Sequence, residues 1–285
     1  DRDRGRKDEG ERDANERHDS GLPCPASYYA ENFGLGETAV MSFTPIRRLG
    51  VLAALVFLAG CGADPADEAE PGRASTGYVV ETVAEGFEYP WSIAFLPDGD
   101  MLVTELPGGL WRITADGAQR IEIDGTPDVV FSEDGQGGLM EVLLSPDFET
   151  DRMVYLSYAD GRPTANATAI WRARLENDAL VDGRRIFRAA PDKDTGAHYG
   201  GRMAFLPDGT LLLGIGEGFA YREQAQIVAN HFGSIVRLNP DGSAASDNPE
   251  LGPEARAEIY SYGHRNPQGL IVDRRDGSVW SHEHG

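Results

Sequence analysis

From residue 78 onward, short apolar runs alternate with tight polar turns. The run at 93–96 leads through Pro-Asp-Gly to a second run at 101–103, and 203–206 leads through the same turn to 211–213. Pro fixes φ and Gly accepts positive φ, so Pro-Asp-Gly favours a sharp reversal of the chain. Short runs rich in β-branched and aromatic side chains are typical of strands. The pattern therefore predicts an all-β structure.

The runs and turns recur as a unit. Comparable units begin near Ile93, Val142, Met203 and Leu270. A recurrence of roughly 50–65 residues with about four strands is typical of a β-propeller blade. One blade cannot bury both of its faces, so neighbouring blades must complete the core. We expect residues 78–285 to form the first three to four blades, of four antiparallel strands each, of a longer propeller. A complete small β-sandwich is the alternative.

The first forty residues have a different composition. Residues 1–20 are almost entirely charged and polar, and they show no apolar period. Such a segment cannot bury enough surface to offset its ordering entropy. We expect residues 1–40 to lie outside the fold, either as translated sequence upstream of a start at Met41 or as a disordered charged arm.

Residues 41–61 have the pattern of an export signal. Arg47 and Arg48 precede an apolar run at 49–59, which is shorter than the about 20 residues that span a bilayer. The run ends in Leu-Ala-Gly-Cys, which resembles a bacterial lipobox. Cys61 would then be lipidated and would anchor the protein in a membrane. An ordinary signal peptide with a chance Cys is the alternative.

The segment 62–77 is rich in Ala, Asp, Glu and Pro, which predicts a flexible tether. We therefore expect an exported protein on the periplasmic side of a membrane. The outer membrane is favoured because Gly62 follows Cys61, in place of the Asp that commonly retains lipoproteins in the inner membrane.

The charge balance excludes one class of partner. The chain has 26 basic and 47 acidic residues, a formal net charge of -21. Nucleic-acid binding needs a basic patch that displaces phosphate counterions, so we expect no nucleic-acid partner. Cys24 and Cys61 are the only cysteines, and neither lies in the predicted propeller. A disulfide is therefore not expected there.

Polar residues interrupt the apolar units at four places. Gln136 lies in Gly-Gln-Gly-Gly, His198 in His-Tyr-Gly-Gly-Arg, and Glu217 in Gly-Glu-Gly. His198 has the pKa range of a general base, and a carboxylate bonded to one imidazole nitrogen raises the basicity of the other. Glu217 follows a strand, so it could return to the end of the blade where His198 lies. An interblade turn, a structural His and a solvated Glu are the alternatives.

The fourth place, residues 260–270, collects Tyr, His, Arg, Asn and Gln just before an apolar run. Surface loops rarely gather so many groups capable of paired hydrogen bonds. His282, Glu283 and His284 follow closely, but no metal-binding helix surrounds them, so a zinc site is disfavoured.

Together these segments resemble the glucose/sorbosone dehydrogenase family. The resemblance runs in order from about residue 83 to 285, and its most specific element is His-Arg-Asn-Pro-Gln-Gly at 264–269. It implies a six-bladed propeller that uses pyrroloquinoline quinone (PQQ) and Ca²⁺. It further implies oxidation of an aldose sugar at C1 to its lactone, with electrons passed to a periplasmic acceptor. A homodimer of the full-length protein is compatible with this reading.

The resemblance also implies roles for individual residues. His198 matches the base that takes the proton from the sugar C1 hydroxyl, and Glu217 matches its acidic partner. Arg265 matches the cation beside the quinone carbonyls, where it stabilises charge developing on oxygen. Asn266 and Gln136 match further quinone contacts.

The predicted calcium-binding element is cut short at Gly285, and residues at some other positions differ from those usual in the family. Gly285 matches a backbone carbonyl ligand of Ca²⁺, in an oxygen-only site that suits this ion. Ala197 replaces an acidic residue of some members, and Met140-Glu141 replaces the usual Leu-Gly. We expect the 285-residue chain by itself to be inactive. A lactonase-type propeller hydrolase and a non-catalytic, membrane-anchored binding propeller are the alternative functions.

Overall fold

The computed structural model describes residues 79–284. The expected leader, signal, lipidated Cys61, tether and calcium ligand Gly285 all lie outside this range, so they stay predictions.

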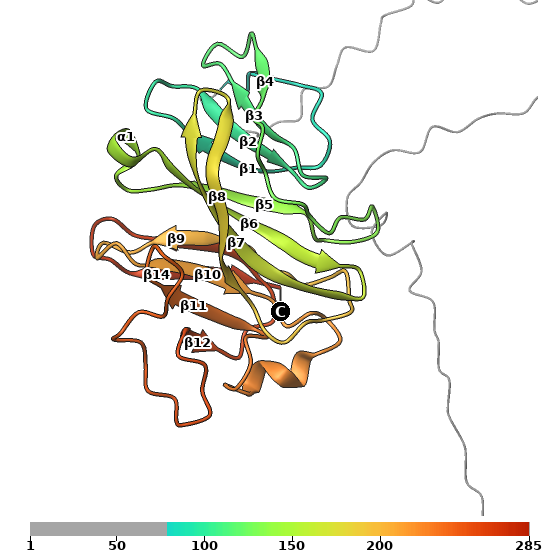
Figure 1. The fold of residues 1–285 in the computed structure, drawn as a ribbon, viewed down its shortest axis with the longest axis vertical. Helices are drawn as coiled ribbons and strands as arrows, with labels where there is room; N and C mark the ends of the chain where they lie inside the picture. Colours follow the sequence, from blue (N-terminus) through green and yellow to red (C-terminus); the bar gives the residue numbers. More distant parts are fainter. Residues whose placement is uncertain (1–78, 285) are drawn as a thin grey trace, which may run out of the picture. The chain divides into compact units, whose positions relative to one another are not determined.

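Within residues 79–284 the chain forms three four-stranded antiparallel sheets, each with its strands in chain order, and a two-stranded hairpin (Figure 1). The first sheet contains β1 (Pro90–Phe95), β2 (Met101–Glu105), β3 (Leu110–Ile113) and β4 (Arg120–Glu122). The second contains β5 (Leu139–Leu144), β6 (Met153–Arg162), β7 (Ala165–Glu176) and β8 (Ala179–Arg188). The third contains β9 (Met203–Phe205), β10 (Leu211–Ile215), β11 (Ser234–Leu238) and β12 (Ile259–Tyr262). The hairpin pairs β13 (Pro267–Val272) with β14 (Val279–Glu283).

The turns have the geometry that Pro-Asp-Gly predicts. Gly99 and Gly209 have φ values of 95° and 84°, and each connects the first two strands of its sheet. In both turns the glycine N–H donates to the leucine carbonyl three residues earlier, at 3.0 Å from Leu96 and 2.9 Å from Leu206. The expectation of an all-β chain built from four-stranded antiparallel units is confirmed.

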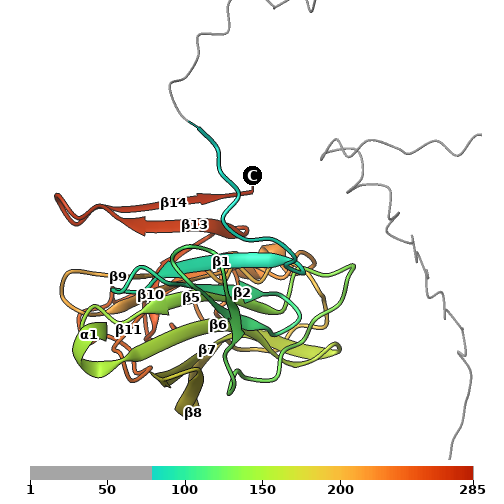
Figure 2. The same ribbon diagram turned by 90° about the horizontal axis from the view of Figure 1, so that it is seen from above.

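The first strands of neighbouring sheets contact one another. β1 packs against β5, β5 against β9, and β9 against β13. Figure 2 shows the hairpin of β13 and β14 as a separate layer beside β9 and β10. Packing of successive sheets through their first strands is the arrangement of propeller blades. The number of blades in the full-length protein stays a prediction.

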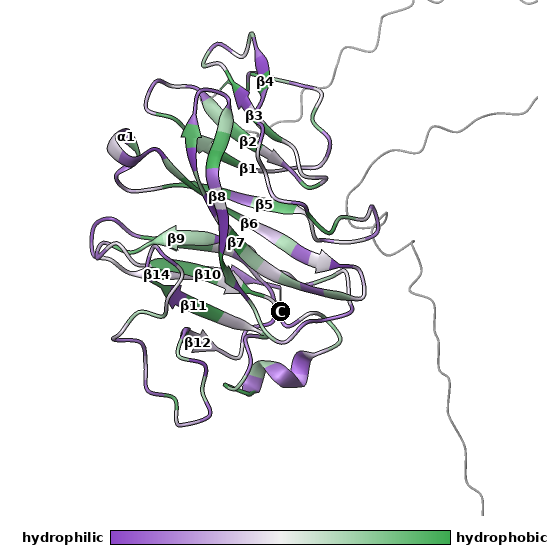
Figure 3. Cartoon of the chain, in the orientation of Figure 1, coloured by the Kyte–Doolittle hydropathy of each residue, from purple (hydrophilic) through white to green (hydrophobic). Residues whose placement is uncertain are grey.

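The core lies between the sheets. Leu102 and Leu156 belong to a cluster between the first and second sheets. Both faces of strand β10 are packed against a neighbouring layer. Leu211 and Leu213 pack against the second sheet, and Leu212 packs against the hairpin. All three are fully buried. Figure 3 shows hydrophobic colour along these strands and hydrophilic colour in the connections around them. A sheet covered on both faces explains why its strands are continuous apolar runs.

The structure corrects one detail of the sequence analysis. Residues 260–262 are not part of a loop before an inner strand, because they form most of β12, the outermost strand of the third sheet. Only residues 263–266 connect to β13. The structure also adds two short helices in the connections between strands: α1 (Phe148–Asp151) lies between β5 and β6, and η2 (Arg222–Gln226) lies between β10 and β11. Among the described residues, no helix is long and apolar enough to cross a membrane.

Candidate functional site

The predicted site residues come from four connections between strands. Gln136 lies between β4 and β5, His198 between β8 and β9, Glu217 after β10, and Arg265 and Asn266 between β12 and β13. The hydrogen bonds described below join Gln136, His198, Glu217 and Arg265 directly, although they are up to 129 residues apart in the sequence, and bond Asn266 to the neighbouring Gly200. The expected return of Glu217 to the end of the blade where His198 lies is therefore confirmed, whereas the roles of the five residues stay predictions.

His198 and Glu217 form a buried pair. The imidazole Nδ1 lies 2.5 Å from Glu217 Oε2, and the two residues are 5% and 1% exposed. The ring of Phe219 packs edge-on against the imidazole, with the ring centroids 5.1 Å apart. Because Glu217 Oε2 also accepts the Phe219 N–H at 3.1 Å, the carboxylate is fixed by its own loop. Glu217 therefore holds the imidazole in the tautomer with its proton on Nδ1.

The backbone around His198 is held by the two predicted amide residues. Gln136 Oε1 accepts the His198 N–H at 2.9 Å, and Asn266 Oδ1 accepts the Gly200 N–H at 3.0 Å. His198 has φ = 50°, in the left-handed region that non-glycine residues seldom adopt. Such a conformation persists only where the surroundings impose it. Gln136 and Asn266 thus orient His198 through its backbone, a role that the sequence did not reveal.

Close packing explains Gly216, which precedes Glu217. A Cβ added there would lie 2.3 Å from the His198 carbonyl oxygen and 2.7 Å from Asn266 Oδ1. No side chain fits at those distances, so glycine lets the Glu217 loop approach the His198 loop closely.

The backbone of Arg265 is bonded to the Glu217 loop. The Glu217 N–H donates to the Arg265 carbonyl oxygen at 2.8 Å, and the Arg265 N–H donates to Glu283 Oε2 at 2.6 Å. Glu283 also approaches His264 Nδ1 at 3.4 Å. The backbone of Arg265 is therefore fixed from both sides, by Glu217 and by the end of β14.

The surroundings lower the pKa of His198 below its ordinary value. Burial is the largest cause, because it disfavours the charged imidazolium. Glu217 opposes this effect, whereas the positive charges of Arg265 and His284 add to it. His198 is therefore neutral near pH 7, and its Nε2 can accept a proton.

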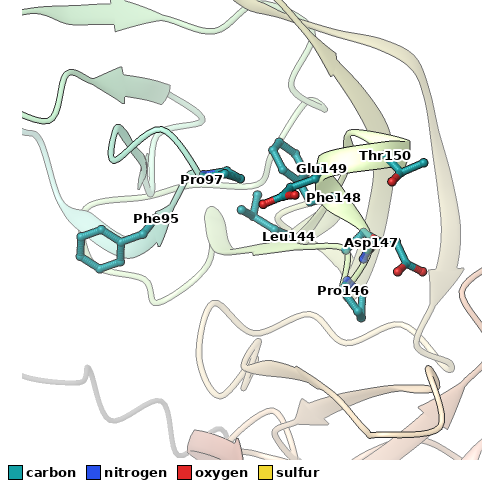
Figure 4. Close-up of a pocket in the computed structure, with 9 residues that line it drawn as sticks. Phe95, Pro97, Leu144, Pro146, Asp147, Phe148, Glu149 and Thr150 are labelled. Atoms are coloured by element: carbon teal, nitrogen blue, oxygen red, sulfur yellow. Dashed lines mark hydrogen bonds between the residues drawn. The ribbon is translucent and has the colours of Figure 1, made fainter.

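Two clefts differ in their relation to this site. The larger, of about 410 Å³, lies between the end of β1 and the β5–β6 connection, and Phe95, Leu144 and Phe148 line it (Figure 4). It contains none of the predicted site residues. The smaller, of about 240 Å³, is lined by Gly135, Gly137, Gly196 and Tyr199, among others, next to Gln136 and His198. We assign the candidate site to this end of the molecule on the grounds of its chemistry rather than cleft size.

The described residues form no cluster of side chains that could hold a metal ion. No group of three or more His, Cys, Asp or Glu side chains converges within residues 79–284. His282 and Glu283 lie in β14, and Glu283 is engaged with Arg265 and His264. The predicted calcium ligand, Gly285, lies outside the described range.

Two residues at the site were missed by sequence reasoning. Glu283 was considered only as part of a possible zinc motif, yet it fixes the backbone of Arg265. Lys193 lies in no motif, yet it is buried beside Thr195 and Tyr199. Lys193 is the only lysine of residues 79–284, and this could have drawn attention to it in the sequence.

The fold and the polar loops together define a β-propeller of the sugar dehydrogenase class. A family model described as Glucose / Sorbosone dehydrogenase matches residues 87–285. The chain therefore belongs to the glucose/sorbosone dehydrogenase family.

Similar proteins agree with this assignment. Aldose sugar dehydrogenase YliI of Escherichia coli is 39% identical over 211 residues, which are 72% of this chain and 56% of the relative. The uncharacterized protein slr1608 of Synechocystis is 42% identical over 221 residues, which are 71% of this chain and 53% of the relative. The solved structure of the PQQ-bound aldose sugar dehydrogenase of Streptomyces coelicolor has a TM-score of 0.63 at 34% identity, and covers 72% of this chain and 59% of that one. The chain thus spans about half the length of these curated relatives.

Proposed function

We propose that the full-length protein oxidises an aldose sugar at C1 to its lactone, with PQQ as its cofactor. The observation that carries the proposal is the buried His198–Glu217 pair, with Nδ1 and Oε2 2.5 Å apart, beside the cationic Arg265. Family membership supports the same reaction class, and the solved relative from Streptomyces coelicolor is a PQQ-bound form.

The chain's own residues supply the acid–base chemistry. Nδ1–H of His198 donates to Glu217, so Nε2 carries the lone pair that accepts the proton of the C1 hydroxyl. The lowered pKa keeps His198 neutral before this transfer. Glu217 then stabilises the imidazolium that forms, because its carboxylate is buried and already hydrogen-bonded to the ring.

The residues at this end fit the quinone part of PQQ. Arg265 provides a fixed cation for carbonyl oxygens, and its charge reaches the imidazole, because it lowers the pKa of His198. The side-chain oxygens of Gln136 and Asn266 are turned toward backbone N–H groups. Contacts with the quinone would therefore come from their amide NH₂ groups. When bound, PQQ supplies the acceptor for the C1 hydride.

Calcium belongs to the same proposal. The backbone carbonyl of Gly285 would contribute one oxygen ligand, which suits a hard cation. Removing Ca²⁺ from the reconstituted full-length protein with a chelator should abolish activity, and adding Ca²⁺ should restore it. Activity that persists after complete removal of divalent cations would rule out the role of calcium.

The location is proposed from the sequence alone. Lipidation of Cys61 would anchor the exported protein on the periplasmic side of a membrane, with the outer membrane favoured, and a periplasmic acceptor would receive the electrons. Cys61→Ser should prevent incorporation of radiolabelled palmitate and release the protein from membranes. A wild-type protein that incorporates no label would contradict the anchor. Sedimentation of the full-length protein would test whether it forms a homodimer.

The decisive experiment uses the full-length protein, reconstituted with PQQ and Ca²⁺ and assayed for reduction of an artificial dye with a panel of aldoses. We expect dye reduction together with lactone formation. No dye reduction with any sugar, together with no PQQ binding, would exclude the proposal. Hydrolysis of added lactones would instead indicate a hydrolase, and stable capture of a protein partner without turnover would indicate a binding propeller.

A further inference from the structure

Lys193 is a buried lysine beside the candidate site. It is 4% exposed, and it lies in the β8–β9 connection that also carries His198. Its backbone N–H and C=O pair with those of Asn166 in β7, both at 2.9 Å. Lysine is almost never buried without a specific partner, because its ammonium loses hydration. The position therefore requires an explanation beyond packing.

The ammonium contacts the chain on both sides of His198. Lys193 Nζ donates to the Thr195 carbonyl oxygen at 2.6 Å, and it lies 3.3 Å from the ring centroid of Tyr199. Thr195 precedes His198 by three residues, and Tyr199 follows it directly. A single cation thus fixes both ends of the short segment in which His198 has its positive φ.

The stem of Lys193 packs against the loop of Glu217. A Cβ added at Gly218 would lie 2.8 Å from Lys193 Cδ, and Thr195 Oγ1 donates to the Gly218 carbonyl oxygen at 2.7 Å. Glu217 Oε1 is buried without a hydrogen-bond partner among the described residues, so the carboxylate depends on nearby charge for stabilisation.

Charge and burial at Lys193 act against each other. Burial lowers the pKa of Lys193 to about 7, although the negative charges of Asp194 and Glu217 oppose the shift. Because the pKa falls on folding, burial of Lys193 costs stability increasingly as the pH falls below the ordinary lysine value, and the full cost is present below about pH 7. A residue retained for stability alone would not carry this cost.

We infer that Lys193 is a positioning residue for the His198–Glu217 pair: its ammonium clamps the segment 195–199 and balances the negative charge of Glu217. This inference rests on the proposed function, in which His198 is the base. Lys193 itself does not contact the reacting atoms in this arrangement, and it acts through its neighbours.

The test compares Lys193→Met and Lys193→Arg with Arg275→Met, in the full-length protein reconstituted with PQQ and Ca²⁺. Arg275 is a matched control, because its side chain is 89% exposed and the variant also removes one cation. We expect Lys193→Met to lower kcat about 10- to 100-fold, as loss of a supporting partner typically does, with little change in KM and with Tm unchanged or higher. Lys193→Arg should recover part of kcat, and Arg275→Met should resemble the wild type.

A second readout does not depend on turnover. The imidazole of His198 is titrated by NMR in the full-length protein without PQQ. Below pH 6.5 Lys193 is charged, so Lys193→Met should leave the negative charge of Glu217 less balanced and raise the pKa of His198. Lys193→Arg should leave that pKa near the wild-type value.

The outcomes distinguish the role of Lys193 as a positioning residue from the role of His198 as the catalytic base. A wild-type kcat and an unchanged His198 pKa in Lys193→Met would overturn the role of Lys193, as would a loss of kcat that only parallels a fall in Tm. If a His198 variant retains full turnover, the proposed function fails, while the NMR titration still decides whether Lys193 positions the pair.

Discussion

Two ion pairs, one partly buried and one fully buried, illustrate two uses of charge. Arg202 Nη1 donates to Glu141 Oε2 at 3.2 Å, and both side chains make further hydrogen bonds. Glu141 also accepts the Ser92 hydroxyl at 3.0 Å, and Arg202 donates to the Gln268 carbonyl at 3.1 Å. The guanidinium lies 3.8 Å from the ring centroid of Trp91. This pair therefore ties together all three sheets and the hairpin.

The His198–Glu217 pair is built differently. It joins the β8–β9 connection to the loop after β10. Its histidine has a left-handed backbone, and Glu217 Oε1 has no hydrogen-bond partner among the described residues. A pair that is bonded to several neighbouring strands supports structure, whereas a buried pair with an unpaired carboxylate oxygen and an imposed backbone strain is available for chemistry. The comparison predicts that changes to the first pair affect stability and changes to the second affect turnover.

The largest effect is expected at His198. His198→Asn should lower kcat by about 10³-fold or more, because no group is left to accept the proton. Asn tolerates positive φ, so the variant should keep its Tm and its PQQ affinity. His198→Ala should lose the same activity but also some stability at φ = 50°. Dye reduction, PQQ titration and calorimetry measure the three quantities; turnover by His198→Asn at the wild-type rate would remove His198 from the mechanism.

Glu217→Gln should have the next largest effect. The amide is nearly isosteric but carries no charge to stabilise the imidazolium, so we expect kcat to fall about 10- to 100-fold with KM almost unchanged. Dye reduction under saturating sugar measures this loss. A variant in which only KM changes would indicate that Glu217 binds substrate instead of supporting His198.

Arg202→Met should reverse the pattern. It leaves the largely buried carboxylate of Glu141 without its cation. Because Arg202 is 30% exposed, the expected loss of stability is about 1–2 kcal/mol, less than for a fully buried pair. Denaturant unfolding of the full-length protein should show this loss, while kcat of the folded fraction stays near the wild-type value. A large fall in kcat without a loss of stability would place Arg202 in the active site and break the comparison.

The pH dependence sharpens the role of His198. Since its pKa is lowered, kcat/KM should stay constant down to about pH 6.5 and fall only below it. Over the same window the unfolded chain binds more protons than the folded one, so His198 should also make stability decrease as the pH falls. Rate and unfolding profiles of the wild type and His198→Asn check both effects. A profile that is identical in the two proteins would contradict the assignment.

The smallest effect is expected for Glu141→Gln. Burial raises the pKa of Glu141, so the folded state binds more protons and the carboxylate costs stability increasingly as the pH rises through that pKa. Gln removes this cost but also weakens the bond to Arg202. We therefore expect a change within about 1 kcal/mol at neutral pH. Relative to the wild type, the variant should gain stability as the pH rises above about 4.5, the ordinary pKa of Glu, in unfolding experiments; the opposite trend would refute the assigned sign.

Much of the fold and of the site could be predicted from the sequence. Pro-Asp-Gly turns at Gly99 and Gly209 and the apolar runs beside them are local signals, and they fixed the position of the strands. Glu217 was predicted to return to the end of the blade where His198 lies, because two antiparallel strands separate them, and the two residues are hydrogen-bonded there. Such inferences succeed because strand length and turn geometry are properties of neighbouring residues.

The remaining features depend on contacts between sheets. The Glu141–Arg202 pair joins residues 61 apart, and the bond from Glu283 to the Arg265 N–H joins residues 18 apart. Residues 260–262 were misplaced because outer strand β12 has one exposed edge, so its polar side chains resemble those of a loop.

By itself, the sequence determined the class of the fold, the order of its units and the residue types that carry the chemistry. The tertiary structure alone decided how those residues cooperate. It turned the amide oxygens of Gln136 and Asn266 toward the backbone around His198, and it buried Lys193 behind that segment. The physical reason is that turns and strands follow from local sterics, whereas burial, pKa and shared hydrogen bonds arise only when distant segments pack together.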